Sequence, residues 1–134
     1  MKLMGRHAGF IALYASLASR DVNFCFCPEF PVNFYGKFGF FERLCHRFLN
    51  GKNHSIVVIA EGMDEAVRDV DLGKDAGVDK SGNKLHADLG LFLKEEIRKY
   101  AAKEHKMDVT VKYIDPTYII RAVPPIASDK ILCT

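Results

Sequence analysis

The sequence predicts an α/β fold, with a mainly parallel sheet and helices on both of its faces. Residues 55–60, SIVVIA, form a continuous apolar run rich in β-branched residues, which is typical of a strand buried in a parallel sheet. Segments with helical spacing alternate with short strand-like segments, and this order favours helices packed over such a sheet. The composition, 49% hydrophobic and 27% charged over 134 residues, suits one globular domain or a part of one.

The first half of the chain contains four further elements besides 55–60. Residues 2–3 resemble the tail of a strand, and apolar residues at helical spacing predict a helix over 7–19. Alternating aromatic and polar residues predict a strand over 22–27, which ends before a proline. A second helix is expected over 41–48, because one apolar face there is followed by Asn50-Gly51, a common helix exit.

The second half begins with a polar, glycine-rich stretch, 63–83, which we interpret as an excursion on the surface. Its aspartates do not have the spacing of a calcium-binding loop. A long amphipathic helix is expected over 85–101, followed by a strand over 109–113. Ser128 is expected to cap one more helix.

The charge and the cysteines narrow the class of protein. Nineteen lysines and arginines against 17 acidic residues give a net charge of +2, which makes no electrostatic case for nucleic acid or membrane as a partner. No apolar run is long enough to cross a bilayer, and no leader pattern is visible at the start. The four cysteines lack metal-site spacing, so we expect reduced thiols in a soluble, cytoplasmic protein.

Two polar segments are expected at the carboxyl edge of the sheet, where open α/β sheets bind ligands. Gly5 and Arg6 stand before a helix, where free amides and the helix dipole favour an anion. Glu61 directly follows the buried strand and could accept hydrogen bonds from ligand hydroxyls. The alternatives are a tight turn with a solvated arginine, and a solvated loop glutamate.

The most directed stretch is 112–124, KYIDPTYIIRAVP. Pro116 has no amide donor for a ladder, so the strand must stop and turn there. The turn places a phenol, Tyr118, three positions from a guanidinium, Arg121, and arginine suits two-pronged contact with a phosphate. The alternative is a surface arginine on a loop broken by proline. The Gly5-Arg6 segment, Glu61 and this turn could all converge on one edge of the sheet.

Several ordered motifs together resemble the phosphofructokinase family, especially its plant and trypanosomatid ATP-dependent enzymes and their pyrophosphate-dependent relatives. The motifs are MGRHAGFIALYASLASRDV, CPE, VVIAEGM, SGNKL, and KYIDPTYIIRAVP with ASD after it. The resemblance implies a Rossmann-like three-layer domain. It also implies a glycolytic kinase, a transferase that moves a phosphoryl group from ATP to the 1-hydroxyl of fructose 6-phosphate, with magnesium bridging the donor phosphates. Residues 1–134 would then be a partial catalytic domain, truncated at both ends.

The resemblance also implies roles for particular residues. Met4, Gly5 and Arg6 match the substrate-side MGR segment, with Arg6 near the transferred phosphoryl group. Glu61 is similar to a glutamate that holds sugar hydroxyls. The remaining matches concern the 6-phosphate of the sugar and comprise Tyr118 and Arg121 as a gripping pair, and Lys112 as a position that reaches it from a neighbouring subunit.

Other implications concern what lies outside these residues. The family's donor-binding loop and catalytic aspartate precede MGR, so no catalytic base and no metal ligand is expected in this chain, and Mg²⁺ would be held elsewhere. The intact protein is expected to be a homodimer or homotetramer. Glu29 matches a position near an effector site of bacterial enzymes, so allosteric control is an open expectation.

Two alternatives within the family stay open. Tyr118 stands where simple bacterial enzymes have histidine, and Ala122 stands where they have glycine, which points to the plant-like and pyrophosphate-using branch. The donor could therefore be pyrophosphate. The other alternative is a non-catalytic regulatory subunit that binds sugar phosphate.

Overall fold

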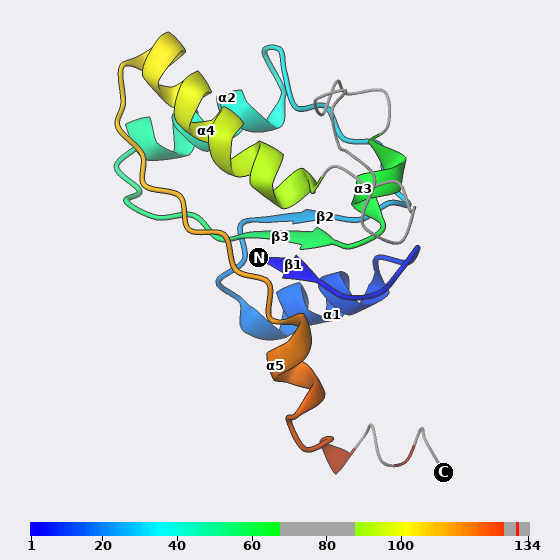
Figure 1. The fold of residues 1–134 in the computed structure, drawn as a ribbon. Helices are drawn as coiled ribbons and strands as arrows, with labels where there is room; N and C mark the ends of the chain where they lie inside the picture. The colour runs from blue at the N-terminus through cyan, green and yellow to red at the C-terminus, as the bar shows by residue number, and fades with distance from the viewer. Residues whose placement is uncertain (68–87, 128–130, 132–134) are drawn as a thin grey trace, which may run out of the picture.

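A parallel sheet lies at the centre of the protein. The computed structural model describes residues 1–67, 88–127 and 131 (Figure 1). Within them, the strand order is β1-β3-β2, with β1 (Lys2–Leu3) and β2 (Phe24–Phe26) on either side of β3 (Val57–Ala60). Both neighbours run parallel to β3. The last three residues of β3 are buried, which confirms that the apolar run forms the central strand.

Helices cover both faces of this sheet, as expected. Helix α1 (Phe10–Ser19) lies on one face, and α2 (Phe40–Leu49) and α4 (Leu89–His105) lie on the other (Figure 1). The first two helices and the amphipathic α4 confirm the helices expected from apolar spacing. Position 85, the expected start of the helix that corresponds to α4, lies outside the described residues.

Aromatic rings fill the space between the sheet, α2 and α4. Phe26 and Phe40 meet edge to face with their ring centroids 5.0 Å apart, and Phe41 stacks on Tyr100 of α4 at 5.4 Å. Phe34, from the loop before α2, is buried edge-on against Phe26. Such pairs add to the stabilisation that burial alone provides. The described residues of β2, α2, α4 and the loop before α2 therefore share one core.

The face of α1 that contacts the sheet differs from the face that predicted the helix. Ala12 is only 1% exposed, whereas Tyr14 is 71% exposed and the other three large residues of the apolar stripe also face outward, namely Phe10, Leu13 and Leu17. Small residues permit a close approach of the helix to the strands. The apolar spacing thus identified the helix, but the side that is buried is the one with Ala12 and not the one with the large apolar residues.

The strand predicted over 109–113 does not form. The segment is extended, and its odd-numbered side chains are half-buried while its even-numbered ones are exposed, so the alternation is present. Within the described residues, however, its only backbone hydrogen bond to the sheet runs from the amide of Lys2 to the carbonyl of Ile114, at 3.0 Å. Because β1 is two residues long, its outer edge offers too few groups for a ladder.

Two short helices complete the described chain. The predicted surface excursion begins instead with α3 (Met63–Ala66), and Met63 is 1% exposed, so this start belongs to the core. The rest of the excursion, and the cap expected at Ser128, lie outside the described residues. The last helix, α5 (Thr117–Arg121), leads away from the sheet on the side of α1 (Figure 1).

Candidate functional site

Glu61 and the loop before α1 form a closed arrangement at the carboxyl end of β3. The Oε2 atom of Glu61 accepts hydrogen bonds from the amides of Gly5, at 3.3 Å, and Arg6, at 3.1 Å. Both loop residues have positive φ angles, 151° and 51°, and the glycine tolerates this without steric cost. These hydrogen bonds therefore hold together two segments that are far apart in sequence, the loop with Gly5 and Arg6 and the residue that follows β3.

Gly62 allows the loop to lie this close. A Cβ atom on Gly62 would be 2.6 Å from the carbonyl oxygen of Arg6 and 3.0 Å from the Cα atom of His7. These contacts are with backbone, which cannot turn aside as a side chain would. A glycine after Glu61 is therefore required for the carboxylate to reach the loop amides.

A second carboxylate holds the start of α1. Glu29, which follows β2, accepts from the amide of Gly9 through Oε1 at 2.8 Å. The amides of Gly5, Arg6 and Gly9 thus bond to the protein's own carboxylates, which occupies part of the backbone of the predicted anion site. Arg6 is exposed, and Met4 is half-buried.

Tyr118 and Arg121 form a pair on α5. The guanidinium carbon of Arg121 lies 5.8 Å from the centroid of the Tyr118 ring, within the range of a cation–π contact. Asp115 fixes the turn before the helix, because its Oδ1 accepts from the Thr117 amide at 3.0 Å and also from the Thr117 hydroxyl. These bonds lower the pKa of Asp115. Tyr118 is 85% exposed, so the pair faces solvent.

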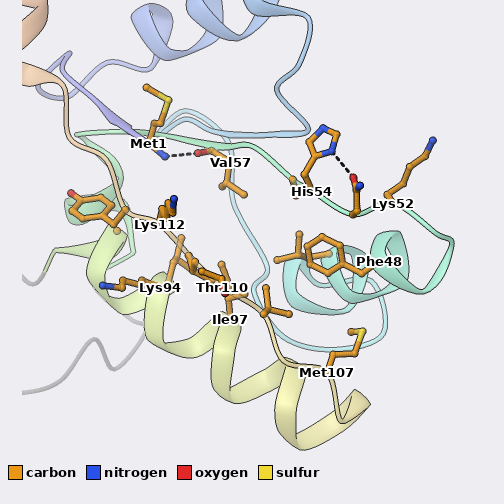
Figure 2. A pocket seen from close by; sticks show the side chains of 18 of the residues that line it. Met1, Phe48, Lys52, His54, Val57, Lys94, Ile97, Met107, Thr110 and Lys112 are labelled. Atoms are coloured by element: carbon orange, nitrogen blue, oxygen red, sulfur yellow. Dashed lines mark hydrogen bonds between the residues drawn. The ribbon is translucent and has the colours of Figure 1, made fainter.

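Lys112 lies apart from both groups. It lines a cavity of about 620 Å³ between α4, the 107–113 segment and the residues that lead into β3 (Figure 2). The walls are mostly apolar, and Lys52 and Lys94 also line it. Lys112 is exposed, and within the described residues its side chain forms no ion pair.

The convergence expected from the sequence is partial. Gly5, Arg6 and Glu61 are in contact, whereas no hydrogen bond, ion pair or ring contact joins them to Tyr118 or Arg121 in the described part of the chain. Figure 1 shows α5 leading away below α1. The carboxyl ends of the strands point instead toward the loop between β1 and α1. The unformed strand explains this difference, because a laddered strand would have fixed α5 relative to the sheet.

Sequence reasoning did not identify one polar cluster, formed by Lys2, Asp64, Asp88 and Tyr113. The Lys2 ammonium lies 2.5 Å from Asp64 Oδ2 and 3.5 Å from Asp88 Oδ1. Asp88 could have been found, because it stands as an N-cap directly before an amphipathic helix. The other contacts join residues far apart in sequence and leave no local signal.

The acidic residues of this cluster do not suit Mg²⁺. The Lys2 ammonium lies within 3.5 Å of both carboxylates, Asp64 and Asp88, and neutralises charge that a cation would need. The described residues hold no group of three or more histidine, cysteine or acidic side chains arranged for a metal ion. Among the described helices, none is long and apolar enough to cross a membrane.

Comparison with known proteins gives consistent matches over the full chain. The sequence is 48% identical over 139 residues to ATP-dependent 6-phosphofructokinase 1 of Arabidopsis thaliana, a match that covers all of this chain and 28% of the relative. It is 41% identical to the enzyme of the same name in Borreliella burgdorferi, and 40% identical to that of Trypanosoma brucei brucei. These two matches cover 99% of this chain and 30% and 26% of the relatives.

The chain thus spans between a quarter and a third of the length of these relatives. The sequence pattern of the family described as Phosphofructokinase matches residues 1–134. Because that match includes the whole chain, and with it every motif of the loop, β3 and α5, the chain belongs to the phosphofructokinase family.

Proposed function

We propose that this chain forms the sugar-phosphate part of an ATP-dependent 6-phosphofructokinase, which transfers a phosphoryl group to the 1-hydroxyl of fructose 6-phosphate. The observation that carries this is the contact of Glu61 with the amides of Gly5 and Arg6 at the carboxyl end of β3. This contact joins a carboxylate to the backbone of Arg6, an exposed arginine, at the edge where open parallel sheets bind ligands.

The residues have distinct roles in this proposal. The two amide bonds hold Glu61 through Oε2, and Oε1 is assigned to accept from sugar hydroxyls. The guanidinium of Arg6 stabilises charge on the phosphoryl group during transfer. Tyr118 and Arg121 bind the 6-phosphate, and Lys112 reaches that phosphate from a neighbouring subunit of a homo-oligomer.

Other parts of the reaction are assigned outside these residues. The base that takes the proton of the 1-hydroxyl, the donor site and the ligands of Mg²⁺ belong to the remainder of a longer, cytoplasmic enzyme. Magnesium, bound there, would neutralise negative charge on the donor phosphates. Positioning of donor against acceptor supplies most of the rate in phosphoryl transfer, so the contribution of this chain is to orient the acceptor.

Replacing Arg121 by alanine in the intact enzyme tests the substrate assignment. Loss of a charge-assisted hydrogen bond costs about 1.5–3 kcal/mol, so KM for fructose 6-phosphate should rise by about 10- to 150-fold. KM for the phosphoryl donor should stay nearly constant. Arg43→Ala, which removes an exposed arginine of α2, is the matched control and should change neither constant. A raised donor KM with an unchanged sugar-phosphate KM would contradict the assignment.

The choice of donor is tested separately. The three relatives described above are all named ATP-dependent, which supports ATP. Steady-state assays of the intact enzyme with each donor should therefore give turnover with ATP. Turnover with pyrophosphate alone would overturn this part of the proposal and leave the sugar-phosphate assignment standing.

A further inference from the structure

The polar cluster of Lys2, Asp64, Asp88 and Tyr113 ties four parts of the chain together. The Tyr113 hydroxyl donates to Asp88, 2.9 Å from Oδ2 and 3.2 Å from Oδ1. Asp88 caps α4 by accepting from the Gly90 amide at 2.8 Å, and Asp64 accepts from the Leu89 amide at 3.1 Å. Lys2 contacts both carboxylates. The cluster therefore joins β1, α3, the start of α4 and the extended segment.

Three of these four residues are close in sequence to a predicted substrate residue. Lys2 precedes Met4 by two positions, and Asp64 follows Glu61 by three. Tyr113 directly follows Lys112 and precedes the turn that leads to α5. A shift of Lys2, Asp64 or Tyr113 would thus move a segment to which we assign substrate contacts.

Tyr113 anchors a segment that has little other attachment to the sheet. Between 108 and 115, the backbone of the described chain makes one hydrogen bond to the sheet, the one from Lys2 to Ile114. The Tyr113 ring packs on the backbone of Gly90, where a Cβ atom would lie 2.2 Å from the ring. Val109 and Val111 also pack against the core. The Tyr113 side chain adds a polar attachment in place of the ladder of backbone bonds that a true strand would have.

The charges of the cluster suit a stable link. Burial, and then the hydrogen bond to Asp88, raises the pKa of the Tyr113 phenol, so it remains a donor at neutral pH. Burial alone would lower the pKa of Lys2, but the two aspartates outweigh it and raise that pKa, so the ammonium remains charged. Side-chain exposure is small at this ion pair, 14% for Lys2 and 11% for Asp64.

From this geometry we infer that the Tyr113–Asp88–Lys2 link is a positioning device, which sets where the segment carrying Lys112 and α5 lies relative to the substrate loop. This inference rests on the proposed function. Tyr113 itself is not assigned a substrate contact, and it acts only through the segment that its side chain anchors.

Tyr113→Phe in the intact enzyme tests the link. The ring would still fill the space over Gly90, while the hydrogen bond to Asp88 would be lost. Loss of one such bond should raise KM for fructose 6-phosphate about 2- to 10-fold, with the donor KM unchanged. Asp88→Asn keeps a good helix cap but removes the charge, so it should raise the same KM.

Tyr100→Phe is the matched control. Tyr100 is also a half-buried tyrosine, and its hydroxyl donates to the Glu42 carboxylate at 3.0 Å, between α2 and α4. The Tyr100→Phe substitution removes an equivalent hydrogen bond that lies away from the substrate segments. It should lower the melting temperature about as much as Tyr113→Phe does, while both KM values stay unchanged. If the two variants had the same kinetics, Tyr113 would be merely structural and the inference would be overturned.

Arg121→Ala separates this inference from the proposed function. If Arg121→Ala raises the sugar-phosphate KM and Tyr113→Phe does not, the function stands and the link is wrong. If Arg121→Ala leaves that KM unchanged, the proposed function fails, and the link fails with it because it has no substrate segment to position. A selective KM increase in both variants supports both proposals.

Discussion

Gly62 shows how one missing side chain shapes the candidate site. Its neighbour Glu61 reaches the amides of Gly5 and Arg6 only because the loop lies directly on the glycine backbone. Arg6 itself has φ of 51°, a conformation that costs a non-glycine residue roughly 1 kcal/mol. The two bonds to the carboxylate offset this cost, so the strained residue and the glycine depend on each other.

Gly62→Ala should therefore weaken the site in the intact enzyme. The new methyl group forces the loop away from Glu61, which should destabilise the protein by about 1–3 kcal/mol and raise KM for fructose 6-phosphate. Thermal unfolding and steady-state kinetics measure the two effects. Gly36→Ala is the control, because a Cβ atom there meets nothing within 4 Å and only its φ of 93° is unfavourable. An unchanged KM for Gly62→Ala would show that the contact is not needed for substrate binding.

At the level of elements, α2 and α4 are joined through one carboxylate. Oε2 of Glu42 accepts from the Tyr100 hydroxyl at 3.0 Å and lies 3.1 Å from Nε2 of His105, near the last turn of α4. The hydrogen bond to His105, and then that to Tyr100, lowers the pKa of Glu42 below its ordinary value of 4.5. The ionised carboxylate is thus favoured by folding.

This arrangement predicts a loss of stability in acid. A carboxylate with a lowered pKa contributes its stability above the unfolded value of 4.5, and that contribution disappears as pH falls through the lower, folded value. The difference in melting temperature between the unmodified protein and Glu42→Gln should therefore shrink below pH 4.5. Glu95→Gln, an exposed change on α4, should show no such trend. A constant difference across this range would contradict the role of Glu42.

At the scale of the whole molecule, the described residues include large apolar side chains that are exposed on α1 and from α5 onward. The outer face of α1 exposes four large residues, and α5 with the residues after it exposes several more, namely Tyr118, Ile119, Val123 and Ile126. Helix α1 carries no charged residue at all. Contiguous exposed apolar surface on a soluble protein is usually covered by other protein, and the relatives are more than three times as long as this chain.

Expressed alone, the 134-residue chain should lack phosphofructokinase activity and should fold poorly or self-associate. No residue assigned here acts as the catalytic base, and the outer face of α1 is open to other chains. Gel filtration and assays with both donors test each part separately. Tyr14→Glu with Leu17→Lys should reduce association, whereas Ser19→Lys at the end of α1 should not. A monomeric and active chain would show that the active site is wrongly placed.

The sequence by itself determined the type and order of most elements, the central strand and the family. These signals are local, because apolar spacing over a few turns reports a helix and a continuous apolar run reports a buried strand. Short motifs at the ends of elements also identified Glu61, Arg6 and the pair on α5 as candidates, and their assigned roles stay predictions.

Only the tertiary structure decided which surfaces and partners those elements meet. Ala12 of α1 is buried against the sheet while four large apolar residues of the helix face outward, and the segment at 109–113 stays outside the ladder because β1 is too short. Lys2 forms an ion pair with Asp64, which lies 62 positions away in the sequence. Such contacts depend on the geometry of distant elements after they pack, and no local pattern of residues encodes them.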